Sequence, residues 1–190
     1  MRDKSYKMKD TIFIAGVHGV GKTYYTNILV NKYKCFNRVS ASSLIKYDVD
    51  VSKTTKKVID IDYNQNVMIR NFLKLRDNTE AILLFDGHFV LIDNKNEICE
   101  ISTDVFNSLN FNEIILFIDN IENIYNRLVK RDNNSDLNLL ELSKMQEREI
   151  LRAKFVSNLL NISLNIINLE NKKDKEILIN LENILVKYLK

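Results

Sequence analysis

The stretch TIFIAGVHGVGKT, residues 11–23, decides the fold that this sequence predicts. Its first five residues form a short, mostly apolar run that stops at Gly16, as in a buried strand. From Gly16 to Thr23 the sequence fits the pattern G-x-x-x-x-G-K-[ST]. Apolar and aromatic residues then recur at helical intervals over 22–34. The stretch therefore predicts a strand, a glycine-rich loop and a helix, in that order.

The loop predicts a binding site for the polyphosphate of a nucleotide. Closely spaced glycines let successive backbone N–H groups point at phosphate oxygens, at a helix N-terminus whose dipole favours negative charge. Lys22 adds a cation for the β- and γ-phosphates, and the Thr23 hydroxyl can ligate Mg²⁺. The alternative is a glycine-rich turn that matches the pattern by chance. We expect ATP and Mg²⁺ as cofactors, with the nucleotide bound at Gly16, Gly19, Val20, Gly21, Lys22, Thr23 and Tyr24.

A second apolar run ends in an acidic residue. Residues 81–85 are all apolar, as in a buried parallel strand, and Asp86 follows them. A carboxylate at the end of a strand beside a phosphate loop can hold the metal, so we expect Asp86 to act with Thr23 at Mg²⁺. The alternative for Asp86 is a turn residue that ends the strand. Gly87 permits a sharp turn, after which His88 either faces the substrate or is a rim histidine.

The remaining chain alternates between strand and helix patterns. Buried apolar strands separated by helices predict an α/β fold, with about five parallel strands and helices on both faces, in one domain over residues 1–190. A small hairpin is expected outside this sheet, over 89–92 and 97–101. Further strands are expected at 113–118 and 163–169, and helices from about 40 and at 62–77, 121–131, 137–160 and 176–189.

Two pairs of arginines lie four residues apart on predicted helices. Arg127 and Arg131 share one helix face and precede a polar segment at 132–136. Phosphoryl transfer needs mobile positive charge around the transferring group, so this segment can act as a closing lid. Arg148 and Arg152 repeat the spacing on the next helix. The alternative for all four is a solvated helix face with acidic neighbours.

The charge balance excludes some classes of partner. Lys and Arg total 28 against 25 for Asp and Glu, and a net charge of +3 indicates no dedicated surface for nucleic acid or anionic membranes. No apolar run approaches the about 20 residues that cross a bilayer. Residues 1–10 are charged and lack the pattern of a secretion signal. We therefore expect a cytoplasmic protein without a membrane partner.

These motifs resemble those of the P-loop nucleoside monophosphate kinases, in particular the adenylate-kinase-like proteins that lack a zinc lid. The loop GVHGVGKT matches, and the segment 39–46, VSASSLIK, looks like the family's I-S-x-G-D-x-L-R. Asp86-Gly87 looks like the start of D-G-F-P-R, and 127–131 looks like R-x-x-x-R before the lid. The order and spacing of these segments also resemble the family, and the resemblance covers most of the chain.

The resemblance implies a three-layer fold whose five-stranded parallel sheet has the order 2-3-1-4-5. It implies an acceptor-binding region at about 40–76 and a short lid at about 132–139. Arg127 would lie against the base of ATP, where it contributes to nucleotide binding, and Arg131 near the phosphates. Lys46 stands where the family has an arginine, and Phe89-Val90 replaces the family's Pro-Arg. The expected acceptor-binding residues are Ser40, Lys46, His88 and Arg70, the last as a substitute for the missing arginine.

The expected activity is transfer of the ATP γ-phosphoryl group to a nucleoside monophosphate or a similar small phosphorylated acceptor. Catalysis would be electrostatic and positional, and would use Lys22, Asp86, Arg127 and Arg131. A phosphate acceptor needs no side-chain base, whereas a hydroxyl acceptor would give its proton to Asp86 or His88. The alternative is a nucleotide-binding switch or slow ATPase that controls a partner protein, as the missing acceptor arginines suggest.

Overall fold

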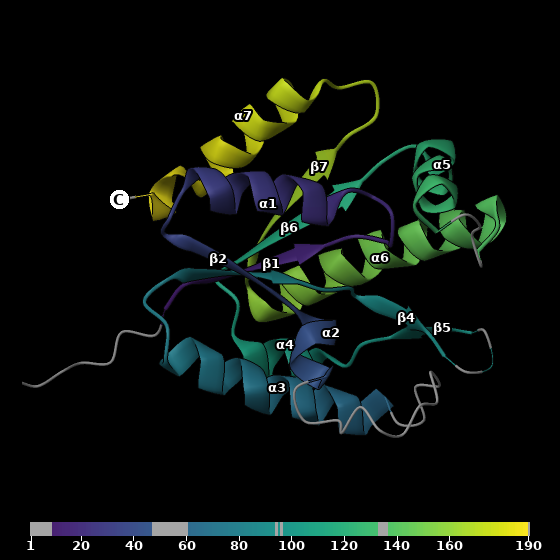
Figure 1. Cartoon of the computed structure of the whole chain (residues 1–190). Coiled ribbons are helices and arrows are strands. Elements are labelled where there is room, and N and C mark those ends of the chain that lie inside the picture. Colours follow the sequence, from purple (N-terminus) through teal and green to yellow (C-terminus); the bar gives the residue numbers. More distant parts are fainter. Residues whose placement is uncertain (1–8, 47–60, 94, 96, 133–136, 190) are drawn as a thin grey trace, which may run out of the picture.

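A five-stranded parallel sheet between two layers of helices forms the centre of the protein (Figure 1). The structure is a computed structural model that describes residues 9–46, 61–93, 95, 97–132 and 137–189. The sheet has the order β2-β3-β1-β6-β7, which is 2-3-1-4-5 when its strands are numbered along the chain. This arrangement confirms the predicted fold. The strands are β1 Thr11–Ala15, β2 Phe36–Ser40, β3 Ile82–Asp86, β6 Glu113–Ile118 and β7 Ser163–Asn168.

Helices cover both faces of the sheet. In Figure 1, α1 and α7 lie on one face, and α3, α4 and α6 lie on the other. The sequence did not indicate α4, which has only seven residues, or β2, whose sequence FNRVS contains two apolar residues and no apolar run. The helices are α1 Lys22–Lys32, α2 Ala41–Lys46, α3 Ile61–Asp77, α4 Thr103–Leu109, α5 Ile121–Asp132, α6 Leu139–Leu160 and α7 Asp174–Leu185, followed by a 3₁₀ turn at Val186–Tyr188.

The predicted hairpin lies outside the main sheet. Strands β4 Val90–Ile92 and β5 Ile98–Glu100 pair antiparallel, as the sequence indicated. Arg148 of α6 pairs with Glu100 at 2.6 Å, and Arg152 donates to the Ile101 carbonyl at 2.8 Å. These two arginines thus hold the hairpin against α6, instead of forming a second cationic group beside a lid.

The register of the parallel strands brings the expected site residues to one edge of the sheet. Asp86, the last residue of β3, is in register with Ile14 of β1 and with Ser40, the last residue of β2. The glycine-rich loop follows β1 directly. The carboxyl ends of neighbouring parallel strands therefore place the loop, Ser40 and Asp86 together, as expected for a ligand site in an open α/β sheet.

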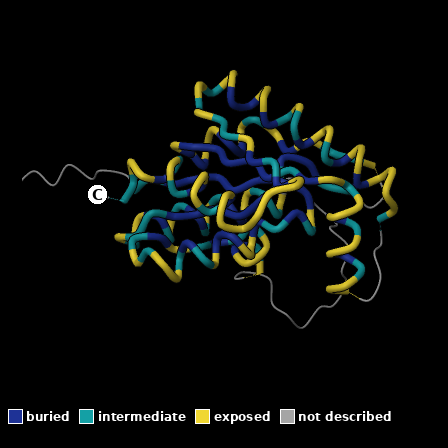
Figure 2. The backbone as a smooth tube through the Cα atoms, turned by 90° about the horizontal axis from the view of Figure 1, so that it is seen from above, coloured by how far each residue is buried: buried dark blue, intermediate teal, exposed yellow. Residues whose placement is uncertain are grey.

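The core is densest along the sheet, where the buried backbone in Figure 2 runs through the middle of the molecule. Phe13 of β1 lies at the centre of an aromatic cluster and is 1% exposed. Its ring centroid lies 4.8 Å from that of Phe111, 5.0 Å from that of Phe89 and 5.5 Å from that of Phe106. The cluster fixes β1 against β3, α4 and the segment that leads into the hairpin.

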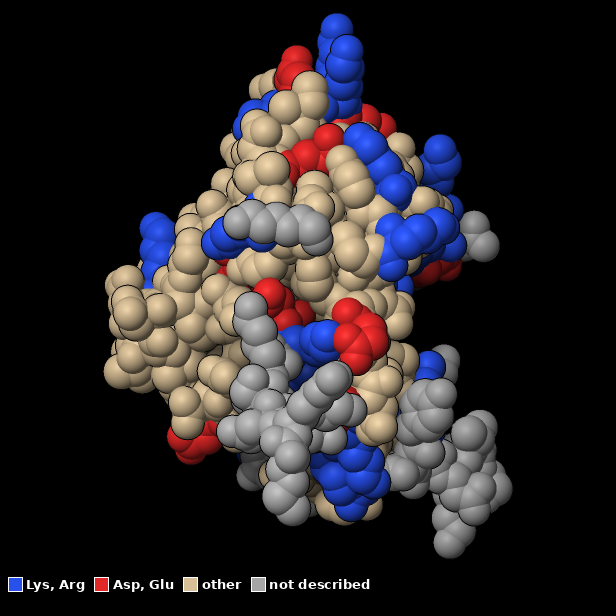
Figure 3. All heavy atoms as spheres, turned by 90° about the vertical axis from the view of Figure 1, so that its left-hand side faces the viewer, with Lys and Arg blue, Asp and Glu red and all other residues tan. Residues whose placement is uncertain are grey.

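Acidic and basic side chains are interspersed on the face shown in Figure 3. Within the described ranges, none of the helices has both the length and the apolar character needed to cross a membrane.

Phe13→Ala should lower the free energy of unfolding by about 3–5 kcal/mol, because it removes the ring at the centre of the aromatic cluster and leaves a cavity. Phe155→Ala is the matched control, because Phe155 is 53% exposed on α6 and should cost less than about 1 kcal/mol. Urea unfolding of both variants measures the difference. Equal losses would show that the cluster does not support β1.

Candidate nucleotide-binding site

The loop after β1 needs glycine both at Gly16, which the motif specifies, and at Gly19, which is one of the motif's variable positions. Gly16 has φ 138° and Gly19 has φ 78°, both in the left-handed region that side chains disfavour. A Cβ on Gly16 would lie 2.5 Å from the Phe117 carbonyl oxygen, and one on Gly19 would lie 2.6 Å from Leu128 Cγ. The loop is therefore packed closely against β6 and α5 and leads directly into the N-terminus of α1.

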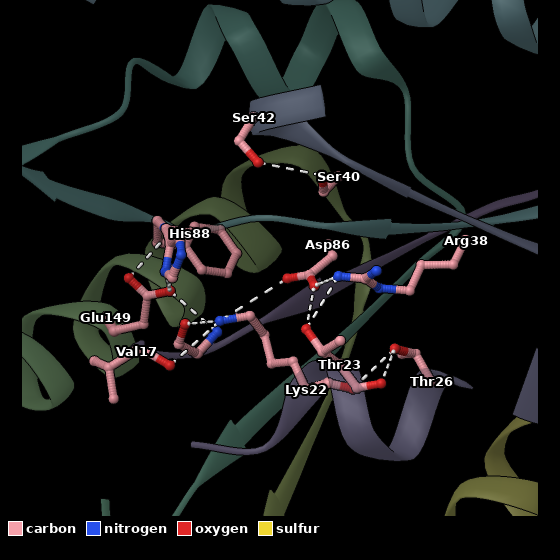
Figure 4. Close-up of polar contacts among 12 residues, drawn as sticks. Val17, Lys22, Thr23, Thr26, Arg38, Ser40, Ser42, Asp86, His88 and Glu149 are labelled. Atoms are coloured by element: carbon pink, nitrogen blue, oxygen red, sulfur yellow. Dashed lines mark hydrogen bonds and ion pairs between the residues drawn. The ribbon is translucent and has the colours of Figure 1, made fainter. Parts of the chain in front are cut away.

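Lys22, the first residue of α1, lies over the loop and is 6% exposed. Its Nζ donates to the Gly16 and Val17 carbonyl oxygens and lies 3.9 Å from Asp86 Oδ1 (Figure 4). Burial lowers the pKa of the Lys22 ammonium, and the Asp86 carboxylate opposes this shift. The lysine is thus a poorly hydrated cation, and a bound phosphate would replace the Gly16 and Val17 carbonyl oxygens as its partners.

Asp86 and Thr23 form the oxygen-rich part of the site. Thr23 Oγ1 donates to Asp86 Oδ2 at 3.2 Å. Arg38 of β2 pairs with the same Asp86 oxygen at 2.6 Å and donates to Thr23 Oγ1 at 3.0 Å (Figure 4). A carboxylate and a hydroxyl are ligands that Mg²⁺ prefers, so this pair fits the metal. The Arg38 guanidinium compensates the Asp86 charge and would compete with Mg²⁺ for it.

A buried carboxylate from α6 connects the loop to the segment after β3. Glu149 is 1% exposed, and its oxygens accept from the backbone N–H groups of Gly16 at 3.2 Å and of Phe89 and Val90 at 2.9 Å (Figure 4). Burial raises the pKa of Glu149 to about 7, although these N–H groups and the Lys22 ammonium stabilise its charged form. One side chain therefore fixes the relative positions of the loop and the hairpin entrance.

Two histidines face each other beside this carboxylate. The ring centroids of His18 and His88 lie 4.2 Å apart, and His88 Nδ1 lies 3.9 Å from Glu149 Oε1. Surrounding protein atoms and the Lys22 ammonium lower the pKa of His18 to about 4, although part of this residue stays exposed to solvent, and burial lowers the pKa of His88 well below its ordinary value. Both rings are therefore neutral at pH 7, and neither adds positive charge to the phosphate site.

Two of the arginines that the sequence indicated, Arg127 and Arg131, lie on α5. Arg127 pairs with the buried Asp119 and donates to the Val20 carbonyl at 3.2 Å, so it holds the back of the loop. Arg131 is 60% exposed in its side chain and pairs with the adjacent Asp132 at 2.6 Å. The next four residues, 133–136, belong to the expected lid and lie outside the described residues.

A cavity of about 560 Å³ connects these groups to Ser40, Ser42 and the residues of α3. Of the nucleotide- and acceptor-binding residues that the sequence indicated, the cavity is lined by Gly19, Gly21, Lys22, Thr23, Ser40, Asp86, His88, Arg127 and Arg131. The lining does not include Gly16, Val20, Tyr24, Lys46 or Arg70.

The five residues outside the lining have other positions. Gly16 and Val20 are buried within the loop. Tyr24 is 53% exposed, and its hydroxyl donates to Asp174 at 2.9 Å. Lys46 and Arg70 are exposed on α2 and α3. Residues 47–60, in the middle of the expected acceptor region, lie outside the described residues.

The sequence did not reveal Arg38 or Glu149 as members of the site. No motif marks Arg38, whose contact with Asp86 arises only from the pairing of β2 with β3. Glu149 did carry a signal, because it occupies a position on the buried stripe of α6 that otherwise contains Leu142, Met145, Ala153 and Val156. A charged residue on such a stripe needs a polar partner in the core.

Comparisons with known proteins give a family and a fold. The sequence model of the AAA domain family matches residues 15–142, more than half of the chain. No curated protein matches the sequence. Among solved structures, TT1252 from Thermus thermophilus matches with a TM-score of 0.59 and 14% identity, over 97% of this chain and 100% of that one. At this identity the match shows the shared fold alone.

Glu149→Gln should change how stability depends on pH. The folded-state pKa of Glu149 is raised to about 7 from an ordinary 4.5, so the folded protein binds more protons than the unfolded chain between these values. The wild type should therefore lose stability relative to the variant as pH rises from about 5 to 8, by about 3 kcal/mol at most.

Unfolding by urea at pH 5 and pH 8 measures this difference for both proteins. Comparison with the variant cancels the contributions of other titrating groups, and the altered hydrogen bonding of the introduced amide adds an offset that does not depend on pH. Parallel pH profiles for the two proteins would contradict the assigned environment of Glu149.

Proposed function

The chain belongs to the AAA domain family, and we propose that it is a Mg²⁺- and ATP-dependent phosphotransferase that acts on a nucleoside monophosphate or a similar small acceptor. The observation that supports this function is the continuity of one cavity, which runs from the phosphate loop past Asp86 to Ser40 and Ser42. A donor and an acceptor can therefore lie in one space, with their reacting groups meeting beside Asp86.

The residues of the loop end have distinct roles in this proposal. Backbone N–H groups of the loop and Lys22 bind the β- and γ-phosphates, and Thr23 and Asp86 hold the metal. Bound Mg²⁺ supplies charge neutralisation on the phosphate oxygens. We expect Arg131, which is exposed and pairs with its neighbour Asp132, to approach the transferring group. Catalysis is then positioning plus electrostatic stabilisation.

A nucleotide-binding switch or slow ATPase that controls a partner protein is the second candidate. It is favoured by one observation, the position of the expected acceptor cations Lys46 and Arg70 outside the cavity lining. Mg²⁺-ATP consumption with and without small acceptors distinguishes the two functions. A phosphotransferase consumes ATP much faster with its acceptor, whereas a switch hydrolyses at a slow rate that small acceptors do not change.

Lys22→Ala should lower ATP turnover by about 100-fold or more, because it removes the cation that binds the transferring phosphate. The measurement is ADP release by purified protein, with circular dichroism and a melting curve to show that the variant is folded. Near-normal turnover by the folded variant would refute the assignment of the loop.

Arg131→Ala should lower kcat by about 100-fold and change the KM for ATP by less than about threefold, because its contact forms mainly in the transition state. Lys130→Ala is the matched control, because Lys130 is the adjacent exposed cation on α5 and does not line the cavity. Steady-state kinetics of both variants separates the two constants. An effect confined to the KM for ATP would contradict a role for Arg131 at the transferring group.

A further inference from the structure

The part of the cavity farthest from the loop, which we call the acceptor chamber, has apolar walls. They come from α3, from the hairpin and its exit, and from α4, three elements that all pack on the same face of the sheet. These walls can bury an apolar ligand body at a gain of about 25 cal/mol per Å² of apolar surface. Their side chains are Met68, Leu91, Ile101, Val105, Phe106 and Leu109.

The polar side chains that the described residues contribute to the acceptor chamber are uncharged. Ser40, Ser42, Asn64 and Gln65 contribute hydroxyl and amide groups to its lining. A phosphate dianion in such a chamber would lose its hydration without gaining an ion pair, which carries a large free-energy cost.

The cations that line the cavity belong to its loop end and already have carboxylate partners. Among the described residues, Lys22 and Arg38 lie beside Asp86, Arg127 pairs with Asp119, and Arg131 pairs with Asp132. Phosphate recognition usually relies on arginine forks with donors available for the ligand. The described walls of the acceptor chamber contain no such fork.

One atom of the acceptor chamber lacks a hydrogen-bond partner among the described residues. Gln65 Oε1, on α3, is buried and accepts no hydrogen bond from this part of the chain. An unsatisfied buried acceptor costs about 1–3 kcal/mol. A ligand with an O–H or N–H group would satisfy this atom, whereas the oxygens of a phosphate dianion cannot donate to it.

We propose that the acceptor is an uncharged small molecule with an apolar body, and that the group it presents for phosphorylation is a hydroxyl. This inference rests on the proposed phosphotransferase function and narrows its acceptor, which the nucleoside monophosphate kinase resemblance would make a phosphate ester. The apolar body occupies the acceptor chamber, a donor group of the ligand satisfies Gln65 Oε1, and the reacting hydroxyl lies towards Asp86.

The reaction balances with ATP as the phosphoryl donor. The hydroxyl oxygen forms a bond to the γ-phosphorus, and the bond from that phosphorus to the bridging oxygen breaks, so that ADP leaves with the electron pair. The hydroxyl proton passes to an oxygen of the transferred phosphoryl group and then to solvent, so the step needs no proton acceptor from the protein.

The first test is ADP release at fixed Mg²⁺-ATP with two matched sets of compounds. One set contains ribonucleosides, deoxyribonucleosides and aryl-substituted alcohols, and the other contains the phosphate monoester of each. At least one uncharged compound should raise ADP release about tenfold or more while its own monoester does not, and mass spectrometry should detect the new ester.

The other outcomes separate this inference from the proposed function. Stimulation by monoesters alone overturns the uncharged acceptor but leaves the phosphotransferase intact. Stimulation by neither set, in protein that still binds ATP by calorimetry, counts against both and favours the switch.

The second test uses two neighbouring residues of α3. Gln65→Ala should raise the KM for the stimulating compound about tenfold, with an unchanged KM for ATP, because it removes the acceptor that contacts this ligand. Asn66→Ala should leave both constants unchanged, because Asn66 is exposed and does not line the cavity. Equal KM values for the acceptor in the two variants would overturn the role of Gln65.

Discussion

The site depends on the buried carboxylate of Glu149. Its two oxygens accept from backbone N–H groups of Gly16, Phe89 and Val90, which belong to the start of the loop and to the segment after β3. Buried N–H groups need acceptors, and neither segment can supply them at this junction, because both have left the sheet. Helix α6 thus fixes the distance between the glycine-rich loop and the segment after β3.

The charges of the site are compensated internally. Asp86 is buried, with 8% of its surface exposed. Its carboxylate pairs with Lys22 and Arg38 and accepts a hydrogen bond from Thr23. Burial of an unpaired carboxylate would be costly. Phosphates would use Lys22 and Arg38, and a divalent cation would use Thr23 and Asp86 itself. Ligand binding at this site is therefore an exchange of partners, in which charges already removed from water acquire new counterions.

The two ends of the cavity differ in chemistry. The loop end has backbone N–H groups, cations and Asp86, whereas the acceptor chamber combines an apolar wall with hydroxyl and amide groups. The resemblance to nucleoside monophosphate kinases arises from motifs at the loop end, at α2 and in the second half of α5. The residues that would select the proposed acceptor lie on α3, α4 and the hairpin, which those motifs do not cover. The same fold can therefore combine a nucleotide site that resembles that of the nucleoside monophosphate kinases with the different acceptor that we propose.

The glycine-rich loop with its flanking strand and helix, and the class of the fold, follow from local patterns in the chain. The glycine pattern from Gly16 to Thr23, the apolar run before Asp86 and the strand and helix periodicities are all local, and such patterns specify a loop, its strand and its helix. The distant residues that complete the site come together only through tertiary packing. Arg38 reaches Asp86 because β2 pairs with β3, and Glu149 reaches the loop because α6 packs across it. Similarly, the exposure of Lys46 and Arg70 and the uncharged walls around Gln65 follow from how the helices pack on the sheet, and no spacing along the chain encodes that packing.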